Sequence, residues 1–484
     1  MATMAAVDLG AQSGRVAVGR FDGERLTVEE IHRFPNEPTR SAGALRWNAT
    51  GLYRSALDGL RAVGHRVDSV AVDSWGVDFG LLDATHRLIE EPVHYRDARR
   101  AAAFHEALEQ IPARELYDRT GIQLQPINTI FELAAMAAEH DPALAAAERL
   151  LLIPDLFHHW LCGSATTELT NATTSQCFDP RAGSWADDLL DRLDIPARVL
   201  PEIVRPGTPL GPVLDGDSGI AGATVIAVAT HDTGSAVAAA PLSGTGSVYL
   251  SVGTWSLVGV ELDEPLIDDE AFRANVTNEG GVAGTTRLLR NVTGLWLLHE
   301  CRRVWAERGR AFSFEQLVEL GRDAPAFEAL IDPNADVFLE PGDMPKRIEE
   351  FCRATGQSPP EGVAGTVRCI LESLALKHAE TVDMLRRVAG MEPVELCVLG
   401  GGARNDLLCQ WTADAAGLPV LAGPDEATLA GNLLVQAMAL GEIGSLAEAR
   451  AVVRASFEPV RYEPKLDSAW AEARDRLVAA EVGA

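Results

Sequence analysis

The sequence predicts an α/β protein in which two domains share one fold. Its 484 residues are enough for about two to four domains of ordinary size. The chain opens with three strands, a helix and another strand, an order typical of a mixed sheet surrounded by helices. The stretch Ser247–Leu262 repeats the pattern of Ala5–Phe21: a strand, a turn of small polar residues and a second strand. This repetition indicates a duplicated core.

Alternating apolar residues and glycine-containing turns predict the first strands. They lie at Ala5–Leu9, Arg15–Phe21 and Leu26–Phe34. Apolar residues at helical spacing then predict a helix at Leu52–Val63, and a short apolar run predicts a strand at Ser69–Asp73. The amino-terminal domain therefore begins as a three-stranded meander followed by a helical crossover.

The same patterns predict the elements of the second half. These are a helix at Thr366–Val388, a strand at Glu395–Leu399, a helix at Asp406–Ala416, a strand at Pro419–Ala422, a helix at Ala427–Leu440 and a surface helix at 466–480. The two halves meet in the small residues TGSAVAAAPLSGTGS. We expect an amino-terminal domain at 1–237 and a carboxyl-terminal domain at 238–484, whose last helix can pack elsewhere.

Composition excludes several classes of protein. The net charge of −28 argues against nucleic-acid binding, which usually needs a basic face. The lysines, at positions 346, 377 and 465, follow no GxxxxG pattern, so a P-loop is excluded. Neither a targeting segment nor a long apolar run is present, and we expect a cytoplasmic protein without membrane contact. Seven scattered cysteines without a C-x-x-C pair argue against a zinc site and a disulfide framework.

The stretch VDLGAQSGR carries the first chemical signal. Asp8 stands at a strand end, where a carboxylate can hold Mg²⁺ through water. Gly10 and Gly14 let the backbone approach phosphates, while Ser13 and Arg15 can donate to them. A plain hairpin with a surface aspartate is the alternative.

Three later stretches add to this signal. In ATVIAVATHDTGSAV, an apolar strand delivers Asp232 to its carboxyl end, where a helix is expected to begin at Gly234 or Ser235. An ionised carboxylate there can act as a general base, although a helix cap explains it equally well. In LSVGTWSL, Gly253 and Thr254 can donate to phosphates or form a simple turn. In LGGGARN, the missing side chains leave room for a flat base.

The stretches that carry a family resemblance run from about residue 5 to about residue 440. They are VDLGAQSGR, IHRFPNEP, VDSWGVDFGLLD, YRDAR, LLIPDLFHHWLCG, TNATTSQ, THDTGSAV, LSVGTWSL, ANVTNEGG, LLRNVTGLWLL and LGGGARNDLL. Together they resemble the fold of actin, hexokinase and Hsp70, in which two duplicated ribonuclease-H-like domains enclose a nucleotide cleft. Within that fold the chain is similar to the FGGY carbohydrate kinases, and nearest to members that phosphorylate L-rhamnulose at its 1-hydroxyl.

The resemblance implies ATP as co-substrate, Mg²⁺ as cofactor and a role for each matching residue. Asp232 would be the proton acceptor. ATP would be bound by Ala11, Gln12, Ser13, Gly14, Arg15, Thr254, His299 and Gly401. The sugar would be bound by Gly76, His231, Thr233 and Asn291. The family has glutamine where this chain has His299, and commonly serine at Gln12.

Several alternatives stay open at this point. Cys352 and Cys369 match a pair that the family can bridge, which stands against the reducing conditions of a cytoplasm. The acceptor sugar could be fuculose, xylulose or glycerol, and a chaperone-like or filament ATPase could share the fold. A sugar-responsive repressor is disfavoured, since the first strand begins by residue 5 and leaves no room for a DNA-binding domain. A monomer and a small homo-oligomer are both compatible with the sequence.

Overall fold

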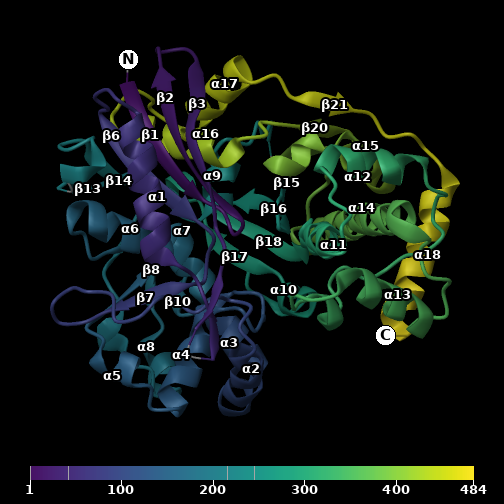
Figure 1. The fold of residues 1–484 in the computed structure, drawn as a ribbon, viewed down its shortest axis with the longest axis horizontal. Helices are drawn as coiled ribbons and strands as arrows, with labels where there is room; N and C mark the ends of the chain where they lie inside the picture. Colours follow the sequence, from purple (N-terminus) through teal and green to yellow (C-terminus); the bar gives the residue numbers. More distant parts are fainter. Residues whose placement is uncertain (1, 42, 215, 245, 484) are drawn as a thin grey trace. The chain divides into compact units, whose positions relative to one another are not determined.

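A computed structural model describes residues 2–41, 43–214, 216–244 and 246–483. The chain forms two compact units, shown as a ribbon in Figure 1. The first unit comprises Met1–Pro241, Glu261–Leu288 and Ala427–Phe457. The second comprises Leu242–Val260, Leu289–Glu426 and Glu458–Ala484. The expected division at 237/238 remains a prediction. The compact units do not test it, because each consists of three separate stretches of the chain.

The first unit is built on a mixed sheet with the order β13-β14-β6-β1-β2-β3. Its strands are β1 (Ala2–Leu9), β2 (Ser13–Phe21), β3 (Leu26–Pro35), β6 (Ser69–Ser74), β13 (Thr208–Pro212) and β14 (Thr224–Ala227). β1 pairs antiparallel with β2 and parallel with β6, and β14 runs parallel to β6. The carboxyl ends of β1, β6 and β14 therefore meet at one edge, where ligands usually bind in such sheets.

Short pairs of strands and many helices complete the first unit. The paired strands are β4 (Thr39–Ser41), β5 (Ala44–Arg46), β7 (Phe79–Leu82), β8 (Arg149–Leu152), β9 (Thr167–Glu168), β10 (Phe178–Asp179), β11 (Ser184–Trp185) and β12 (Ile203–Val204). A further strand, β17 (Thr277–Gly280), is the edge strand of a seven-stranded sheet and neighbours β18. The helices are α1 (Ala49–Ala62), α2 (Arg99–Gln110), α3 (Ala113–Thr120), α4 (Thr129–Ala138), α5 (Pro142–Ala146), α6 (Ile153–Cys162), α7 (Leu169–Ala172), α8 (Asp187–Arg192), α9 (Asp232–Ala238), α10 (Asp269–Ala274), α16 (Ala427–Ala439) and α17 (Leu446–Ser456).

Helix α16 packs on the first sheet although it lies late in the chain. In Figure 1 its yellow-green ribbon lies against the purple strands β1 to β3. Leu429, Leu433 and Leu434 share one buried core cluster with Met4 and Phe21. This burial removes large apolar surfaces from water and fixes α16 to the amino-terminal sheet.

The second unit repeats the central pairing of the first. Its strands are β15 (Ser247–Val252), β19 (Glu395–Leu399), β20 (Val420–Ala422), β21 (Val460–Tyr462), β16 (Trp255–Leu262) as far as Val260, and β18 (Thr286–Thr293) from Leu289 onward; Arg287 of β18 thus belongs to the first unit. β15 pairs antiparallel with β16 and parallel with β19, as β1 does with β2 and β6. Its helices are α11 (Trp296–Glu307), α12 (Phe314–Asp323), α13 (Met344–Ala354), α14 (Gly362–Val388), α15 (Asp406–Ala416) and α18 (Ser468–Gly483). The predicted duplication of the core is thereby confirmed.

The predicted strands and helices are present, with ends that shift by a few residues. One shift matters for the site: α9 begins at Asp232 rather than at Gly234 or Ser235. Asp232 is therefore the first residue of the helix, and His231 precedes it in extended conformation. Among the helices of the described residues, none combines the length and apolar character that crossing a bilayer requires.

Candidate active site

The first strand pair places a carboxylate beside an arginine. Asp8 and Arg15 are directly opposed on β1 and β2, and Nη2 of Arg15 donates to Oδ2 of Asp8. On the other side of β1, Asp8 is in register with Asp73 of the parallel strand β6. Since residues in register on neighbouring strands project to the same face, two carboxylates stand side by side at this sheet edge.

The predicted phosphate loop lies between these strands. The amide of Gly10 donates to the carbonyl of Ser13 at 3.0 Å and closes a tight turn. Asn36 braces the turn, since its Nδ2 donates to the carbonyl of Gly10 at 2.9 Å. A Cβ at Gly14 would lie 2.2 Å from the ring of Phe34, so close packing requires glycine there. Ala11, Gln12, Ser13 and Arg15 remain at least partly exposed and thus accessible to a ligand.

Asp73 is completely buried and was not predicted as a site residue. Its Oδ2 accepts a hydrogen bond of 2.6 Å from Nδ2 of Asn432 on α16, while Oδ1 has no hydrogen-bond partner among the described residues. Burial raises the pKa of Asp73 well above its ordinary value, the charge of Asp8 adds to this, and the bond from Asn432 opposes it. The charge of Asp232 also raises the pKa of Asp73, by a smaller amount. The structure therefore gathers three carboxylates at this edge of the sheet.

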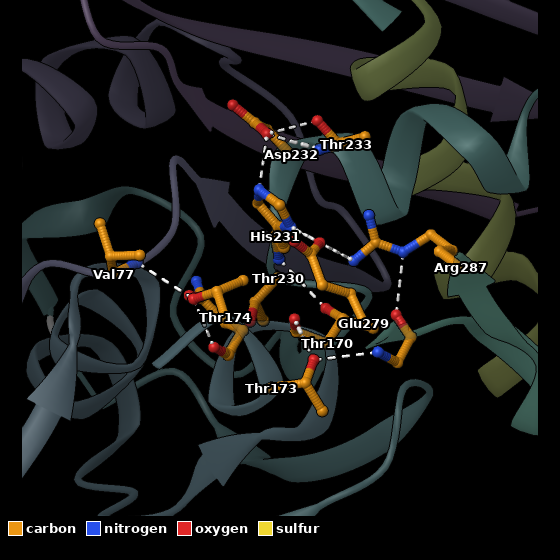
Figure 2. A network of polar contacts seen from close by, with 12 residues as sticks. Val77, Thr170, Thr173, Thr174, Thr230, His231, Asp232, Thr233, Glu279 and Arg287 are labelled. Atoms are coloured by element: carbon orange, nitrogen blue, oxygen red, sulfur yellow. Dashed lines mark hydrogen bonds and ion pairs between the residues drawn. The ribbon is translucent and has the colours of Figure 1, made fainter. Parts of the chain in front are cut away.

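Asp232 is the carboxylate that a substrate can reach. Its side chain is 31% exposed, whereas Asp73 is 0% exposed. Oδ1 of Asp232 accepts from the amide of Thr233 at 2.5 Å and from its hydroxyl at 3.1 Å. In Figure 2 the other carboxylate oxygen points away from these partners. Burial of the carboxyl raises its pKa, and His231 opposes that rise.

His231 stands between Asp232 and two further charged residues (Figure 2). Its Nε2 lies 3.4 Å from Oδ1 of Asp232, and its Nδ1 lies 3.0 Å from Oε2 of Glu279 on β17. Arg287 of β18 pairs with the same Oε2 at 2.9 Å, and its Nε donates to the carbonyl of Gly280. Arg287 and His231 together lower the pKa of Glu279 against the effect of its burial. Glu279 is therefore a buried carboxylate held in its charged form.

A cluster of threonines fixes the backbone before α9. Glu168 is buried and accepts hydrogen bonds of 2.9 Å from both the amide and the hydroxyl of Thr230. The hydroxyl of Thr170 accepts from the amide of His231 at 3.2 Å. These bonds occupy polar groups that would otherwise be buried without partners, and they fix the position of His231 and Asp232.

The loop that contains Gly76 lies at the end of β6. A Cβ at Gly76 would lie 2.9 Å from the hydroxyl oxygen of Thr174, so glycine fits this close contact. The next residue, Val77, has φ of 67°, which a β-branched residue rarely adopts. Its amide donates to the same hydroxyl of Thr174, and its carbonyl accepts from Thr129. Strained backbone held by buried hydrogen bonds is often found at functional sites.

Asp78 anchors this loop from the protein interior. Its Oδ2 accepts from the indole N–H groups of Trp47 at 2.6 Å and Trp75 at 3.0 Å. Its Oδ1 accepts from Nη2 of the buried Arg100 at 2.8 Å. Burial raises the pKa of Asp78 to about 6, and Arg100 and the indoles oppose that rise. Buried hydrogen bonds therefore hold the loop next to the partly exposed Gly76.

In the second unit, the turn from Gly253 to Thr254 is closed by the start of α11. The carbonyl of Thr254 accepts from the amides of Gly294 and Trp296, both at 3.2 Å. A Cβ at Gly294 would lie 2.5 Å from the backbone of Trp255, so this contact needs glycine. Asn291 of β18 and His299 of α11 lie within a few residues of Gly294 in the sequence, and both are half-buried. His299 contacts Phe314 edge-on at 4.8 Å, and burial lowers its pKa to about 4.

The glycine stretch after β19 also lies in the second unit. A Cβ at Gly401 would meet open space, whereas one at Gly402 would lie 2.3 Å from Val252. Gly401 is exposed and Gly402 is buried. The first glycine leaves room for a ligand, and the second allows close packing on β15.

Cys352 and Cys369 are free thiols in the structure. The thiol of Cys369 donates toward Cys352, which raises the pKa of Cys369 and lowers that of Cys352. The bridge that the resemblance allows is therefore not formed here.

The structure brings some predicted site residues together and adds others. Asp8, His231, Asp232, Thr233, Gly76 and the loop from Ala11 to Arg15 belong to the first unit; Thr254, Asn291, His299 and Gly401 belong to the second. Sequence reasoning missed Asp73, Glu279, Arg287 and Asn432. Asp73 ends the stretch VAVD of one strand, and Asp8 of VDLG stands near the end of another. This likeness could have suggested Asp73 as a candidate. Only the fold brings Glu279 and Arg287 to His231.

Comparisons with known proteins agree over nearly the whole chain. Residues 3–239 match the N-terminal domain and residues 248–440 the C-terminal domain of the "FGGY family of carbohydrate kinases". The chain is 42% identical over 471 residues to a rhamnulokinase of Bacteroides thetaiotaomicron, with 96% of each chain covered. It is 40% identical over 470 residues to a rhamnulokinase of Enterococcus faecalis, covering 95% of this chain and 94% of that one.

Solved structures show the same architecture. A ligand-bound xylulose kinase from Lactobacillus acidophilus has a TM-score of 0.78 at 16% identity, covering 100% of this chain and 97% of that one. Plasmodium falciparum glycerol kinase with ADP has a TM-score of 0.74 at 15% identity, covering 99% and 97%. At such low identity these structures show a likeness of fold alone.

Proposed function

The chain belongs to the FGGY family of carbohydrate kinases, and we propose that it transfers the γ-phosphoryl group of ATP to the 1-hydroxyl of L-rhamnulose. The observation that carries the proposal is the reactive carboxylate: Asp232 is partly exposed at a helix start, is held by Thr233 and is faced by His231. Relatives that are about 40% identical over nearly the full chain are rhamnulokinases by name, which supports the choice of sugar.

Asp232 is the proposed general base. Phosphoryl transfer to a sugar requires a group that orients the attacking hydroxyl and accepts its proton. The carboxylate oxygen that points away from Thr233 and His231 is available for this contact (Figure 2). The dipole at the start of α9 and the neighbouring His231 both favour the ionised form that a base needs.

The proposed sugar contacts come from both units. His231 and Thr233 flank Asp232 in sequence, and Gly76 is partly exposed on a loop that buried hydrogen bonds of Val77 hold in place. Asn291 is proposed as a sugar contact from the second unit on the basis of the resemblance. A preformed set of donors of this kind lowers the entropic cost of binding and favours one orientation of the sugar.

The proposed nucleotide contacts come from two turns and a glycine stretch. Ala11 to Arg15 offer backbone amides, a hydroxyl and a guanidinium, which suit phosphate oxygens. In the second unit, Thr254 would contact the phosphates and Gly401 would lie against the nucleotide. His299 stands where the family has glutamine; burial keeps it neutral near pH 7, so it can still donate one hydrogen bond.

The residues at the sheet edge fit a Mg²⁺ ion that is held largely by water and phosphate. Asp8 and Asp73 lie in register, and Oδ1 of Asp73 is buried without a hydrogen-bond partner among the described residues. No cluster of three or more metal-ligating side chains lies within the described ranges. Mg²⁺ keeps much of its hydration in proteins and often takes only one or two carboxylates. Asp8 would hold the ion through water. When bound, Mg²⁺ neutralises charge on the β- and γ-phosphates.

Other acceptors define the alternatives. Xylulose, fuculose and glycerol kinases share the family, and the fold does not separate them. A chaperone-like or filament ATPase would hydrolyse ATP without a sugar. We further propose that the enzyme acts in the cytoplasm on small molecules, without nucleic acid or membrane, as a monomer or small homo-oligomer.

A coupled assay of ADP release tests the choice of substrate. The full-length enzyme, ATP and Mg²⁺ are incubated with a panel of L-rhamnulose, L-fuculose, D-xylulose and glycerol. We expect the highest kcat/KM for L-rhamnulose and a sugar-1-phosphate as product. A preference for another member of the panel would overturn the substrate, and ADP release that is independent of sugar would favour the ATPase alternative.

A further inference from the structure

The charged groups behind His231 have no part in the function proposed so far. Glu279 lies on β17 and Arg287 on β18, and both side chains are almost fully buried, at 5% and 0% exposure. Burying a carboxylate and a guanidinium is costly unless each is paired. Their pairing at 2.9 Å explains how they can be buried, but it does not explain why Nδ1 of His231 lies 3.0 Å from the same Oε2 atom.

The donors around Oε2 of Glu279 define the orientation of the imidazole ring. Nη2 of Arg287 lies 3.2 Å from Nδ1 of His231, and a guanidinium can only donate. Nδ1 of His231 and Nη2 of Arg287 both lie against Oε2 of Glu279, at 3.0 Å and 2.9 Å, while Nε2 of His231 faces Oδ1 of Asp232 at 3.4 Å. If the ring were flipped, a carbon would face one of the two carboxylates. The arrangement is thus a chain from Asp232 through His231 to Glu279 (Figure 2).

We propose that Glu279, paired with Arg287, is a positioning residue for phosphoryl transfer: it holds the imidazole of His231 so that Nε2 faces the carboxylate of Asp232. This inference rests on the proposed role of Asp232 as the base. The charge of His231 lowers the pKa of Asp232, so an imidazole held in this place favours the ionised carboxylate that a base needs. Glu279 acts only through His231 and does not touch the substrate.

Other charged groups also act on His231 and Asp232. Arg287 of β18 approaches the imidazole of His231. The charges of Asp8 on β1 and Asp73 on β6 oppose ionisation of Asp232. Replacing Glu279 removes the carboxylate that lies against Nδ1 of His231, so the imidazole is held less firmly beside Asp232. Asp232 then ionises at higher pH, and the acid limb of the kcat/KM profile moves to higher pH.

A double-mutant cycle tests the inference in the full-length enzyme. We expect Glu279→Gln to lower kcat by about 10- to 100-fold, by analogy with the loss of a residue that orients a metal-ligating histidine. In a His231→Gln background the same change should have little further effect, because its route of action is gone. The acid limb of the pH profile should move upward in Glu279→Gln. Equal losses in both backgrounds, or an unmoved acid limb, would overturn the inference.

Two further variants make the result specific. Glu168→Gln is the matched control, since Glu168 is a buried carboxylate near His231 that bonds Thr170 and Thr230 instead of the ring. Whatever loss it causes should be the same in both backgrounds, and a loss that vanishes with His231 would overturn the specific role of Glu279. If Glu279→Gln does not fold, Glu279→Gln/Arg287→Gln replaces it, because both charges of the pair are then removed together.

The failure of this inference can be separated from that of the proposed function. Asp232→Asn is measured in the same series. If it retains a near-normal kcat, the proposed base is wrong. If it loses kcat while the Glu279 and His231 changes are additive, only the positioning role is wrong.

Discussion

Nδ2 of Asn432 donates a 2.6 Å hydrogen bond to Oδ2 of Asp73, and this bond joins residues 359 positions apart in the chain. Both side chains are completely buried. Gln436, one turn further along α16, donates to Oδ1 of Asn432 and to the carbonyl of Ala5, and it accepts from Ser69. A polar network thus links a late helix to the two strands that carry Asp8 and Asp73. Such a network is stabilising only while every member keeps its partner.

Replacing Asn432 with leucine should therefore destabilise the first unit. The change leaves the carboxyl of Asp73 and the amide of Gln436 buried with fewer partners, and we expect a loss of about 2–4 kcal/mol in the free energy of unfolding. Urea denaturation measures it. Thr428→Val on the same helix is the control, because Thr428 is partly exposed and should change stability by no more than about 0.5 kcal/mol. Equal stabilities of the two variants would contradict this account of the network.

Gly431 should tolerate no side chain, because α16 meets α9 there. A Cβ at this position would lie 1.7 Å from the carbonyl oxygen of Ser235, which is backbone and cannot rotate away. Alanine favours a helix by about 1 kcal/mol over glycine, but overpacking costs about 1–3 kcal/mol and would displace the helix that begins with Asp232. We expect Gly431→Ala to lower the unfolding midpoint and kcat together. Gly216, whose Cβ would meet open space, provides the control Gly216→Ala, and matching effects at both positions would be inconsistent with this contact.

Stability should fall with acid partly because His158 is buried in its neutral form. Its Nε2 accepts from the amide of Val72 on β6 at 3.1 Å, and burial lowers its pKa to about 3. Its folded pKa lies below the unfolded value of about 6.5, so it stabilises the protein fully above pH 6.5 and loses that contribution as pH falls toward 3. The slope is about 1.4 kcal/mol per pH unit.

Denaturation at pH 7.5 and pH 5.0 checks this sign. Between these values, the unfolding free energy of the unchanged protein should fall by about 2 kcal/mol more than that of His158→Gln, which has no proton to bind. An identical fall in both proteins would show that His158 is not kept neutral by burial. His65→Gln serves as the control at an exposed histidine and should leave the pH dependence unchanged.

Gly401 and Gly402 are neighbours with opposite expected roles. Gly401→Ala adds a methyl group to open space, so stability should not change, while KM for ATP should rise if the nucleotide lies against this backbone. Gly402→Ala places a methyl group 2.3 Å from Cβ of Val252 and should cost about 1–3 kcal/mol of stability. Thermal unfolding and ATP titration measure both effects. An unchanged KM for ATP in Gly401→Ala would remove this glycine from the nucleotide site.

Local sequence patterns predicted most of the fold because each pattern reflects a local cause. The hairpin of Ala5–Phe21 has alternating apolar residues and a glycine turn, and both survive in β1 and β2. The start of α9 was placed too late, at Gly234 or Ser235. In the structure the turn begins at Asp232, and the buried bonds from Glu168 and Thr170 to the preceding backbone hold it there.

The site was predictable only where a motif is continuous in sequence. Asp8, His231 and Asp232 each lie in a short stretch with glycines and a strand, so the sequence alone could propose them as candidates. Asn432 and Glu279 act through residues that are far away in the chain, at Asp73 and His231. No local pattern encodes such a contact, since it depends on how α16 and β17 pack.

The proposed base is tested most directly by the kcat of Asp232→Asn at saturating L-rhamnulose and ATP. Loss of a general base predicts a fall of about 10²- to 10⁴-fold, with ATP binding retained in calorimetry. Asp187→Asn is the matched control, because Asp187 is also the first residue of a helix but is exposed away from any proposed contact. A kcat for Asp232→Asn close to that of the unchanged enzyme would contradict the account.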